Sequence, residues 1–115
     1  HHPDLWQAFR RTLAELRALE PVLTAEGEAR TWVERPAAER EVHLWEKRLA
    51  ERTVIIAVNR DRDAGAVHFE PRWIPADSTV RVEFEDREVR LQGVSLADTF
   101  GPLEAHVYSW TAPGP

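Results

Sequence analysis

The chain has 115 residues, of which 15 are Lys or Arg and 20 are Asp or Glu, so its formal charge is −5. This length suits a single domain, and the negative charge argues against a protein that binds nucleic acid or an anionic membrane. The absence of Cys excludes disulfides, thiolate metal sites and cysteine nucleophiles, and no apolar run approaches the roughly 20 residues of a membrane span.

The start of the chain indicates a piece of a longer protein. The sequence contains no Met, not even an initiator, and it opens on His1 and His2. We interpret residues 1–3 as a tag remnant or linker. The following residues are charged and amphipathic and lack the apolar core of a signal peptide. A composition without Cys fits either a cytoplasmic or a secreted bacterial protein, so the compartment stays open.

Residues 4–20 are predicted to form an amphipathic helix. Six apolar side chains recur three or four residues apart and form one stripe: Leu5, Trp6, Phe9, Leu13, Leu16 and Leu19. Asp4 suits the N-cap, and Pro21 disfavours helical geometry at Glu20. The stripe either covers one sheet of the domain or packs on a domain that is missing here, so its members are packing residues in both cases.

From about residue 30 onward the apolar residues alternate, as they do in strands. Residues 31–33 read as a short strand. In residues 41–49 the side chains of Val42, Leu44 and Glu46 share one side of a second strand. Glu46 is the carboxylate closest to an apolar setting, and we interpret it as a solvated edge residue.

The next two segments continue the strand pattern. Residues 53–59 are a nearly continuous apolar run rich in β-branched side chains, which indicates a central strand buried on both faces. Residues 66–70 follow after a polar turn, with Val67 and Phe69 on one face. The succession of strands and short turns predicts an antiparallel meander.

The second half of the chain predicts further short strands. Residues 79–84 alternate with Val80, Val82 and Phe84 inward, and a tight turn at residues 86–87 leads into a strand at 88–91. Residues 92–99 are expected to be irregular.

The last strand is predicted over residues 103–110, with Leu103, Ala105 and Val107 entering the core, and residues 111–115 are expected to be a disordered tail. The fold class is therefore mainly β. We expect an antiparallel, Greek-key-like or jelly-roll-like β-sandwich of about six to eight strands over residues 30–110, preceded by one helix.

No residue is assigned a catalytic, cofactor-binding or metal-binding role. The histidines His43, His68 and His106 are interpreted as ordinary half-exposed strand residues, and a zinc site built from all three stays open as the alternative. The serines Ser78, Ser95 and Ser109 lack the glycine-flanked setting of a nucleophile elbow.

Five tryptophans leave two interpretations open: Trp6, Trp32, Trp45, Trp73 and Trp110. The first is that they fill the core of the sandwich and the seam between helix and sheet. The second is that some of them stack on sugar rings from an exposed sheet face, because aromatic planes match the apolar faces of sugars. We prefer the first interpretation.

A family resemblance is carried by residues 97–108, which read Ala-Asp-Thr-Phe-Gly-Pro-Leu-Glu-Ala-His-Val-Tyr. This segment resembles the D-x-F-x-P-x-x-V-H-V-Y ending of the β-sandwich that follows the catalytic (β/α) barrel in many glycoside hydrolases. Residues 53–59 and 80–89 look like two further strand segments of those sandwiches. Residues 5–23 are similar to the last barrel helix. Ala105 and Gly101 replace the usual Val and Ala, which are small changes.

The resemblance implies a non-catalytic C-terminal accessory domain that braces its own catalytic barrel through an apolar interface. No catalytic residue is carried over, because the catalytic carboxylates of such enzymes lie on barrel strands. The implied partners are the missing barrel or a second copy through an apolar patch, without nucleic acid, membrane or cofactor. The alternative is a carbohydrate-binding module that uses exposed Trp residues.

Overall fold

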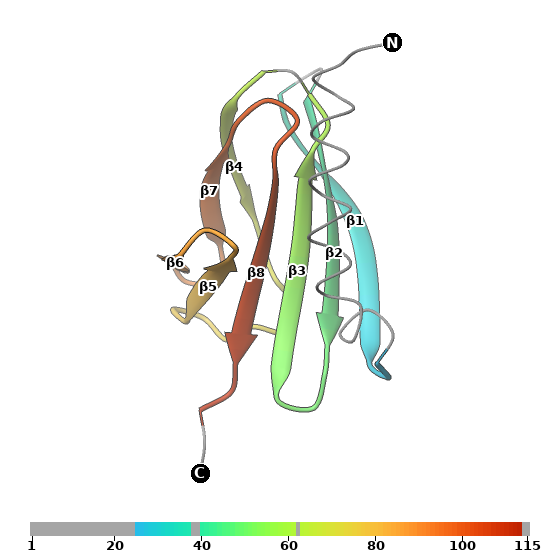
Figure 1. The fold of residues 1–115 in the computed structure, drawn as a ribbon, viewed down its shortest axis with the longest axis vertical. Coiled ribbons are helices and arrows are strands. Elements are labelled where there is room, and N and C mark those ends of the chain that lie inside the picture. Colours follow the sequence, from blue (N-terminus) through green and yellow to red (C-terminus); the bar gives the residue numbers. More distant parts are fainter. Residues whose placement is uncertain (1–24, 38–39, 62, 114–115) are drawn as a thin grey trace.

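The computed structural model describes residues 25–37, 40–61 and 63–113. The eight strands of this part are β1 (Glu28–Ala37), β2 (Arg40–Arg48), β3 (Arg52–Asn59), β4 (Gly65–Phe69), β5 (Thr79–Glu83), β6 (Arg87–Arg90), β7 (Leu96–Phe100) and β8 (Ala105–Thr111). They form a six-stranded sheet in the order β1-β2-β3-β8-β5-β6 and a two-stranded sheet of β4 and β7 (Figure 1). The expected mainly β, antiparallel fold is confirmed. The predicted helix at residues 4–20 lies outside the described residues.

The first three strands form two consecutive antiparallel hairpins, and the pairing of β2 with β3 agrees with the predicted meander. The predicted meander is wrong beyond this point, because β4 leaves the large sheet and pairs with β7. The place beside β3 is taken by β8, so the end of the chain runs through the middle of the large sheet (Figure 1). β4 buries Val67 and Phe69 on one face, as predicted, and this face closes the main core.

The main core lies between the two sheets. Its buried residues come from both sheets and from the connections after β4 and β6: Val42, Leu44, Ile55, Ala57, Val67, Phe69, Ile74, Val80, Val82, Leu91, Leu96, Phe100 and Tyr108. A second cluster, Val54, Ile56 and Val107, lies on the opposite face of the large sheet, which we call the outer face. Side chains of β3 alternate between the two clusters, which confirms that residues 53–59 form a central strand buried on both faces.

Strand β8 is also buried on both faces. Val107 belongs to the outer-face cluster, whereas Tyr108 is wholly buried in the main core. The strand begins at Ala105 rather than Leu103, whose φ of 56° places it in a left-handed turn, and it continues to Thr111. The predicted inward face is therefore wrong: in the middle of the sheet, the alternate residues that include Tyr108 face the main core.

The turn between β5 and β6 differs from the prediction. Val80 and Val82 are buried as expected, but Phe84 is 52% exposed. The strand ends at Glu83, and Phe84 begins a turn with a φ of 68°, a conformation that L-residues other than Asn and Asp seldom adopt. The alternating pattern therefore continues in the sequence for one residue beyond the strand.

Two segments contain more strand than the sequence indicates. Residues 92–99, predicted to be irregular, contain most of β7, which hydrogen-bonds to β4 along its whole length. The apolar pattern does not indicate this strand, because Asp98 stands at an inward position between Leu96 and Phe100. At the other end of the fold, β1 spans ten residues, whereas only residues 31–33 are predicted as strand.

Candidate functional site

A polar cluster joins the two sheets where β6, β7 and β8 meet. The Arg87 guanidinium donates two hydrogen bonds to the Asp98 carboxylate, at 3.2 and 2.8 Å, and the Tyr108 hydroxyl donates to the same carboxylate at 2.7 Å. The backbone N–H of Thr99 donates a further bond at 2.9 Å. We call Arg87, Asp98 and Tyr108 the seam cluster, because it ties β7 of the small sheet to two strands of the large sheet.

The protonation states of the seam cluster are fixed by its own contacts. Burial raises the pKa of Asp98, but hydrogen bonds from Arg87, Tyr108 and the Thr99 amide outweigh burial and hold that pKa below its usual value. The hydrogen bond to Asp98 raises the pKa of Arg87, and burial beside Asp98 raises the pKa of Tyr108 far above its ordinary value. A carboxylate held ionised by these donors has no proton to give, so this geometry supports packing rather than general acid catalysis.

His106 lies next to the seam cluster and is only 2% exposed, so its interpretation as a half-exposed histidine is wrong. Its Nδ1 faces the Glu85 carboxylate, and its Nε2 lies 2.7 Å from the Glu104 carboxylate and 3.0 Å from the Thr99 carbonyl oxygen. The ring packs 4.4 Å from the ring of Phe100. These contacts link the turn after β5 to β7 and β8.

The three strand histidines lie on different parts of the fold. His43 is on the outer face of β2, 3.1 Å from Glu41, and His68 is exposed on β4, whereas His106 is buried. The hydrogen bond from His43 and the charge of Arg35 lower the pKa of Glu41. Within residues 25–37, 40–61 and 63–113, no group of three His, Asp or Glu residues is arranged to hold a metal ion.

Glu46 is completely buried, so its interpretation as a solvated edge residue is wrong. Its carboxylate accepts a hydrogen bond from Arg30 Nε at 2.9 Å and three from the backbone N–H groups of Arg72 and Trp73 at 3.0, 3.1 and 2.9 Å. The carboxylate therefore fastens the connection after β4 to β1 and β2. A buried charge paired in this way is a structural tie.

The tryptophans of the described strands serve packing. Trp32 and Trp110 pack against the main core, Trp45 packs against the outer-face cluster, and Trp73 is half-buried in the connection after β4. Trp6 lies outside the described residues. The exposed large apolar side chains of the described part are Val33, Phe84 and Val94. None of them is a Trp, which favours the packing interpretation over an aromatic sugar platform.

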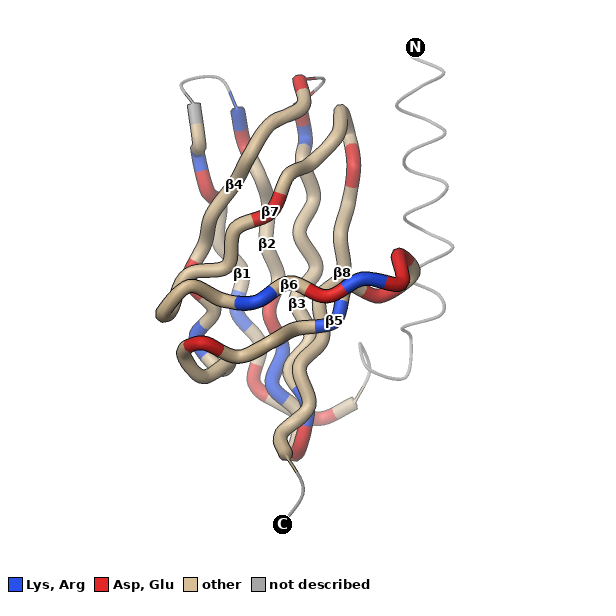
Figure 2. The backbone as a smooth tube through the Cα atoms, turned by 90° about the vertical axis from the view of Figure 1, so that its left-hand side faces the viewer, with Lys and Arg blue, Asp and Glu red and all other residues tan. Residues whose placement is uncertain are grey.

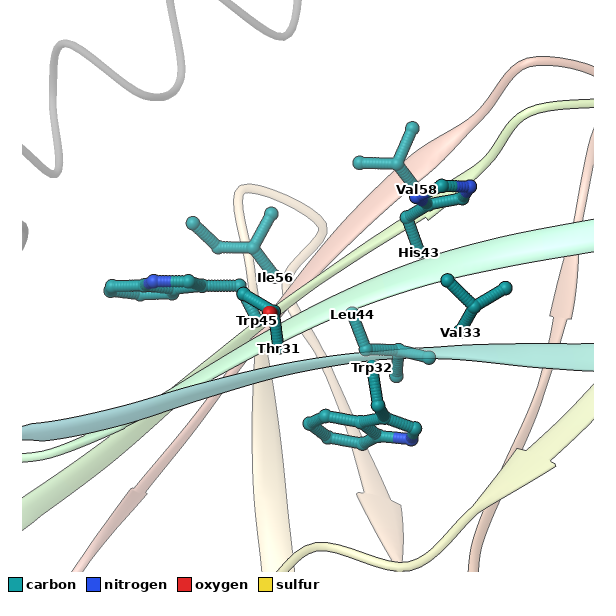
Figure 3. A pocket seen from close by; sticks show the side chains of 8 residues that line it. All are labelled: Thr31, Trp32, Val33, His43, Leu44, Trp45, Ile56 and Val58. Atoms are coloured by element: carbon teal, nitrogen blue, oxygen red, sulfur yellow. The ribbon is translucent and has the colours of Figure 1, made fainter.

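An open apolar pocket lies on the outer face across β1, β2 and β3. The side chains of six of its residues point to this side of the sheet in Figure 3: Thr31, Val33, His43, Trp45, Ile56 and Val58. Trp32 and Leu44 point to the other side, toward the main core. Trp45 stands opposite Ile56 and His43 opposite Val58 in the strand register. The lining contains no carboxylate, so the pocket suits apolar contact rather than hydrolysis.

Charges are distributed evenly over the strands. Among the residues that the structure describes, acidic and basic ones are interspersed in Figure 2 and form no basic stripe, in keeping with the negative net charge. As far as the structure describes the chain, it contains no helix long and apolar enough to cross a membrane.

Known proteins resemble this chain in structure. No family model and no curated protein matches its sequence. Crystal structures of AmyP in complex with maltotriose and with maltose match 90% of the chain, with TM-scores of 0.66 and 0.65 at 20% and 19% identity. The α-amylase from Geobacillus thermoleovorans, complexed with acarbose, matches 71% of the chain with a TM-score of 0.54 at 18% identity. A GH30 endoxylanase from Clostridium papyrosolvens matches 68% with a TM-score of 0.51 at 15% identity.

These matches cover a small part of each neighbour. The chain spans 20% of the two AmyP chains, 18% of the Geobacillus amylase and 22% of the endoxylanase. At identities of 20% and below, the likeness shows a shared fold. This fold therefore occurs as a small part of an α-amylase and of a GH30 endoxylanase.

Proposed function

We propose that the chain is a non-catalytic C-terminal accessory domain of a glycoside hydrolase and that it braces the catalytic barrel. The observation that carries this proposal is the match of 90% of the chain to a fifth of AmyP. Residues 97–108 point to the same enzymes independently, through the motif they share with sandwiches that follow a barrel. On this proposal the substrate is bound and cleaved elsewhere in the parent protein.

The placement of the buried carboxylates supports a non-catalytic role. Glycoside hydrolysis needs two carboxyl groups about 5–10 Å apart that both face the scissile bond. Glu46 instead binds Arg30 and two backbone N–H groups, and Asp98 binds Arg87 and Tyr108. Both carboxylates are thus committed to holding the sandwich together.

The bracing role is supported by the apolar outer face. A domain interface within a chain is stabilised by burying apolar side chains, at about 25 cal/mol for each Å² removed from water. Val54, Ile56 and Val107 form a buried apolar cluster on the large sheet, with Trp45 partly buried beside it, so this face is a place of apolar contact. A rigid sandwich fixed to the barrel at this face would slow the unfolding of the barrel's last elements.

A carbohydrate-binding module is the second candidate, and the observation that favours it is Trp45 in the open pocket of the outer face. The isolated chain separates the two candidates. With maltotriose or xylo-oligosaccharides at millimolar concentration, we expect no change in Trp fluorescence and no release of reducing sugar. A saturable response that Trp45→Ala abolishes and Trp73→Phe retains would replace our proposal with the binding module. Hydrolysis by the isolated chain would overturn both candidates.

A further inference from the structure

The centre of the outer face, on β3 and β8, is buried, although no described strand packs on it. Val54 is 0%, Ile56 8% and Val107 2% exposed. The two-stranded sheet covers the opposite face, where its side chains join the main core. Side chains on an open sheet face keep contact with water, because their strand neighbours shield them only from the sides. Something therefore covers this face.

Two polar residues of the same face lead to the same conclusion. Lys47 and Ser109 stand opposite Val54 in the register of β2, β3 and β8, and they are only 6% and 7% exposed. Ser109 donates its hydroxyl to Glu83 at 2.6 Å, which orders its side chain. A lysine on an open face extends its ammonium group into water, so the burial of Lys47 indicates a layer above it.

The start of the described chain restricts the identity of that layer. Gly27 lies so close to the end of β2 that a Cβ on it would be 2.3 Å from the Arg48 carbonyl oxygen. β1 therefore begins at the end of the large sheet where β2 passes into β3, so the preceding segment is joined to the sheet at this end. Residues 21–26 separate Gly27 from the predicted helix at residues 4–20.

The predicted helix matches the outer face in length and chemistry. Seventeen helical residues extend about 25 Å. The eight residues of β3 extend about 26 Å. The stripe of Leu5, Trp6, Phe9, Leu13, Leu16 and Leu19 is apolar, as is the cluster it would meet. A chain that reverses direction over residues 21–26 can lay this stripe along β3.

We propose that the apolar stripe of residues 4–20 packs on the outer face and forms a third layer of the domain. This contact deepens the proposed function. Only one part of the inference rests on that function, namely that the covering segment is the last helix of the barrel. The sandwich would brace the barrel by holding this helix. The contact itself belongs to the 115-residue chain, so its test does not depend on the parent enzyme.

The absence of Cys in the chain makes single thiol probes informative. In the full chain, a thiol at Ile56→Cys is expected to react with a thiol reagent at least 100-fold more slowly than one at Val94→Cys, where the native side chain is 55% exposed. Adding Leu16→Glu, in the centre of the stripe, should raise the rate at position 56 at least 10-fold. The matched control Ala14→Glu inserts the same charge outside the stripe and should leave the rate unchanged.

A second measurement covers the outcome that Leu16→Glu unfolds the chain. Cys pairs that join position 56 to positions 9, 13 or 16 add no charge, and at least one pair should form a disulfide within a single chain. Disulfides that form only between chains would assign the face to a second copy and overturn the proposal. Reaction at position 56 as fast as at position 94, or no disulfide from any of the three pairs, would also overturn it.

Discussion

Replacing Asp98 with Asn is expected to lower the free energy of unfolding by about 2 kcal/mol at pH 7, because it removes the charged acceptor shared by Arg87 and Tyr108, although Arg87 keeps its ion pair with Glu85. The Asp98 side chain is only 9% exposed, and it holds β6, β7 and β8 together through Arg87 and Tyr108. Urea unfolding followed by Trp fluorescence measures the change. The control Glu88→Gln makes the same carboxylate-to-amide change at an exposed position of β6 and should alter stability by less than about 0.5 kcal/mol.

The effect of Asp98→Asn should depend on pH in a defined direction. The folded protein lowers the pKa of Asp98, so the stabilisation is fully present above the unfolded value of about 3.9 and is lost as pH falls through the folded value. The difference in the free energy of unfolding between wild type and Asp98→Asn should therefore become smaller below about pH 4. A gap that is constant from pH 7 to pH 3 would show that the charge of Asp98 does not matter.

Replacing Glu46 with Ala is the second large effect, with an expected loss of about 3–5 kcal/mol. The substitution leaves Arg30 Nε and the backbone N–H groups of Arg72 and Trp73 without their acceptor at a buried site, whereas Arg30 Nη2 keeps the Glu70 carbonyl oxygen. Glu46→Gln keeps one oxygen and should lose less. Both variants are measured by urea unfolding at pH 7.

The exposed Glu51 in the turn between β2 and β3 supplies the control for Glu46. Glu51→Ala removes a carboxylate of the same length and should change the free energy of unfolding by less than about 0.5 kcal/mol. Equal losses in Glu46→Ala and Glu51→Ala would contradict a structural tie at Glu46, because removal of any carboxylate would then have the same effect.

The strands that the sequence predicts well are those whose apolar pattern is set by burial alone. Residues 53–59 are the clearest case, because a strand buried on both faces needs apolar residues at every position. Strand β7 is missed because Asp98 occupies an inward position, and its partner Arg87 becomes a neighbour only after folding. Phe84 is misplaced because the alternation does not show that its φ becomes positive.

The polar ties of the fold could not be identified from spacing. Glu46 receives its hydrogen bonds from Arg30 and from two backbone groups 26 and 27 residues away, and backbone N–H groups leave no mark in the sequence. The alternation with Ala105 and Val107 predicts that His106 points outward. In the structure, the Glu85 carboxylate, in the turn between β5 and β6, faces the His106 ring. The structure adds the partners of Glu46 and His106, which lie far from them in the sequence.

In the natural gene, the coding sequence immediately upstream of residue 4 tests the central claim most directly. If the chain is an accessory domain of a glycoside hydrolase, the same reading frame should encode a (β/α) barrel with two catalytic carboxylates at strand ends. Residues 4–20 should follow directly as its last helix. A start codon just before the chain, or an upstream domain of another class, would contradict the claim.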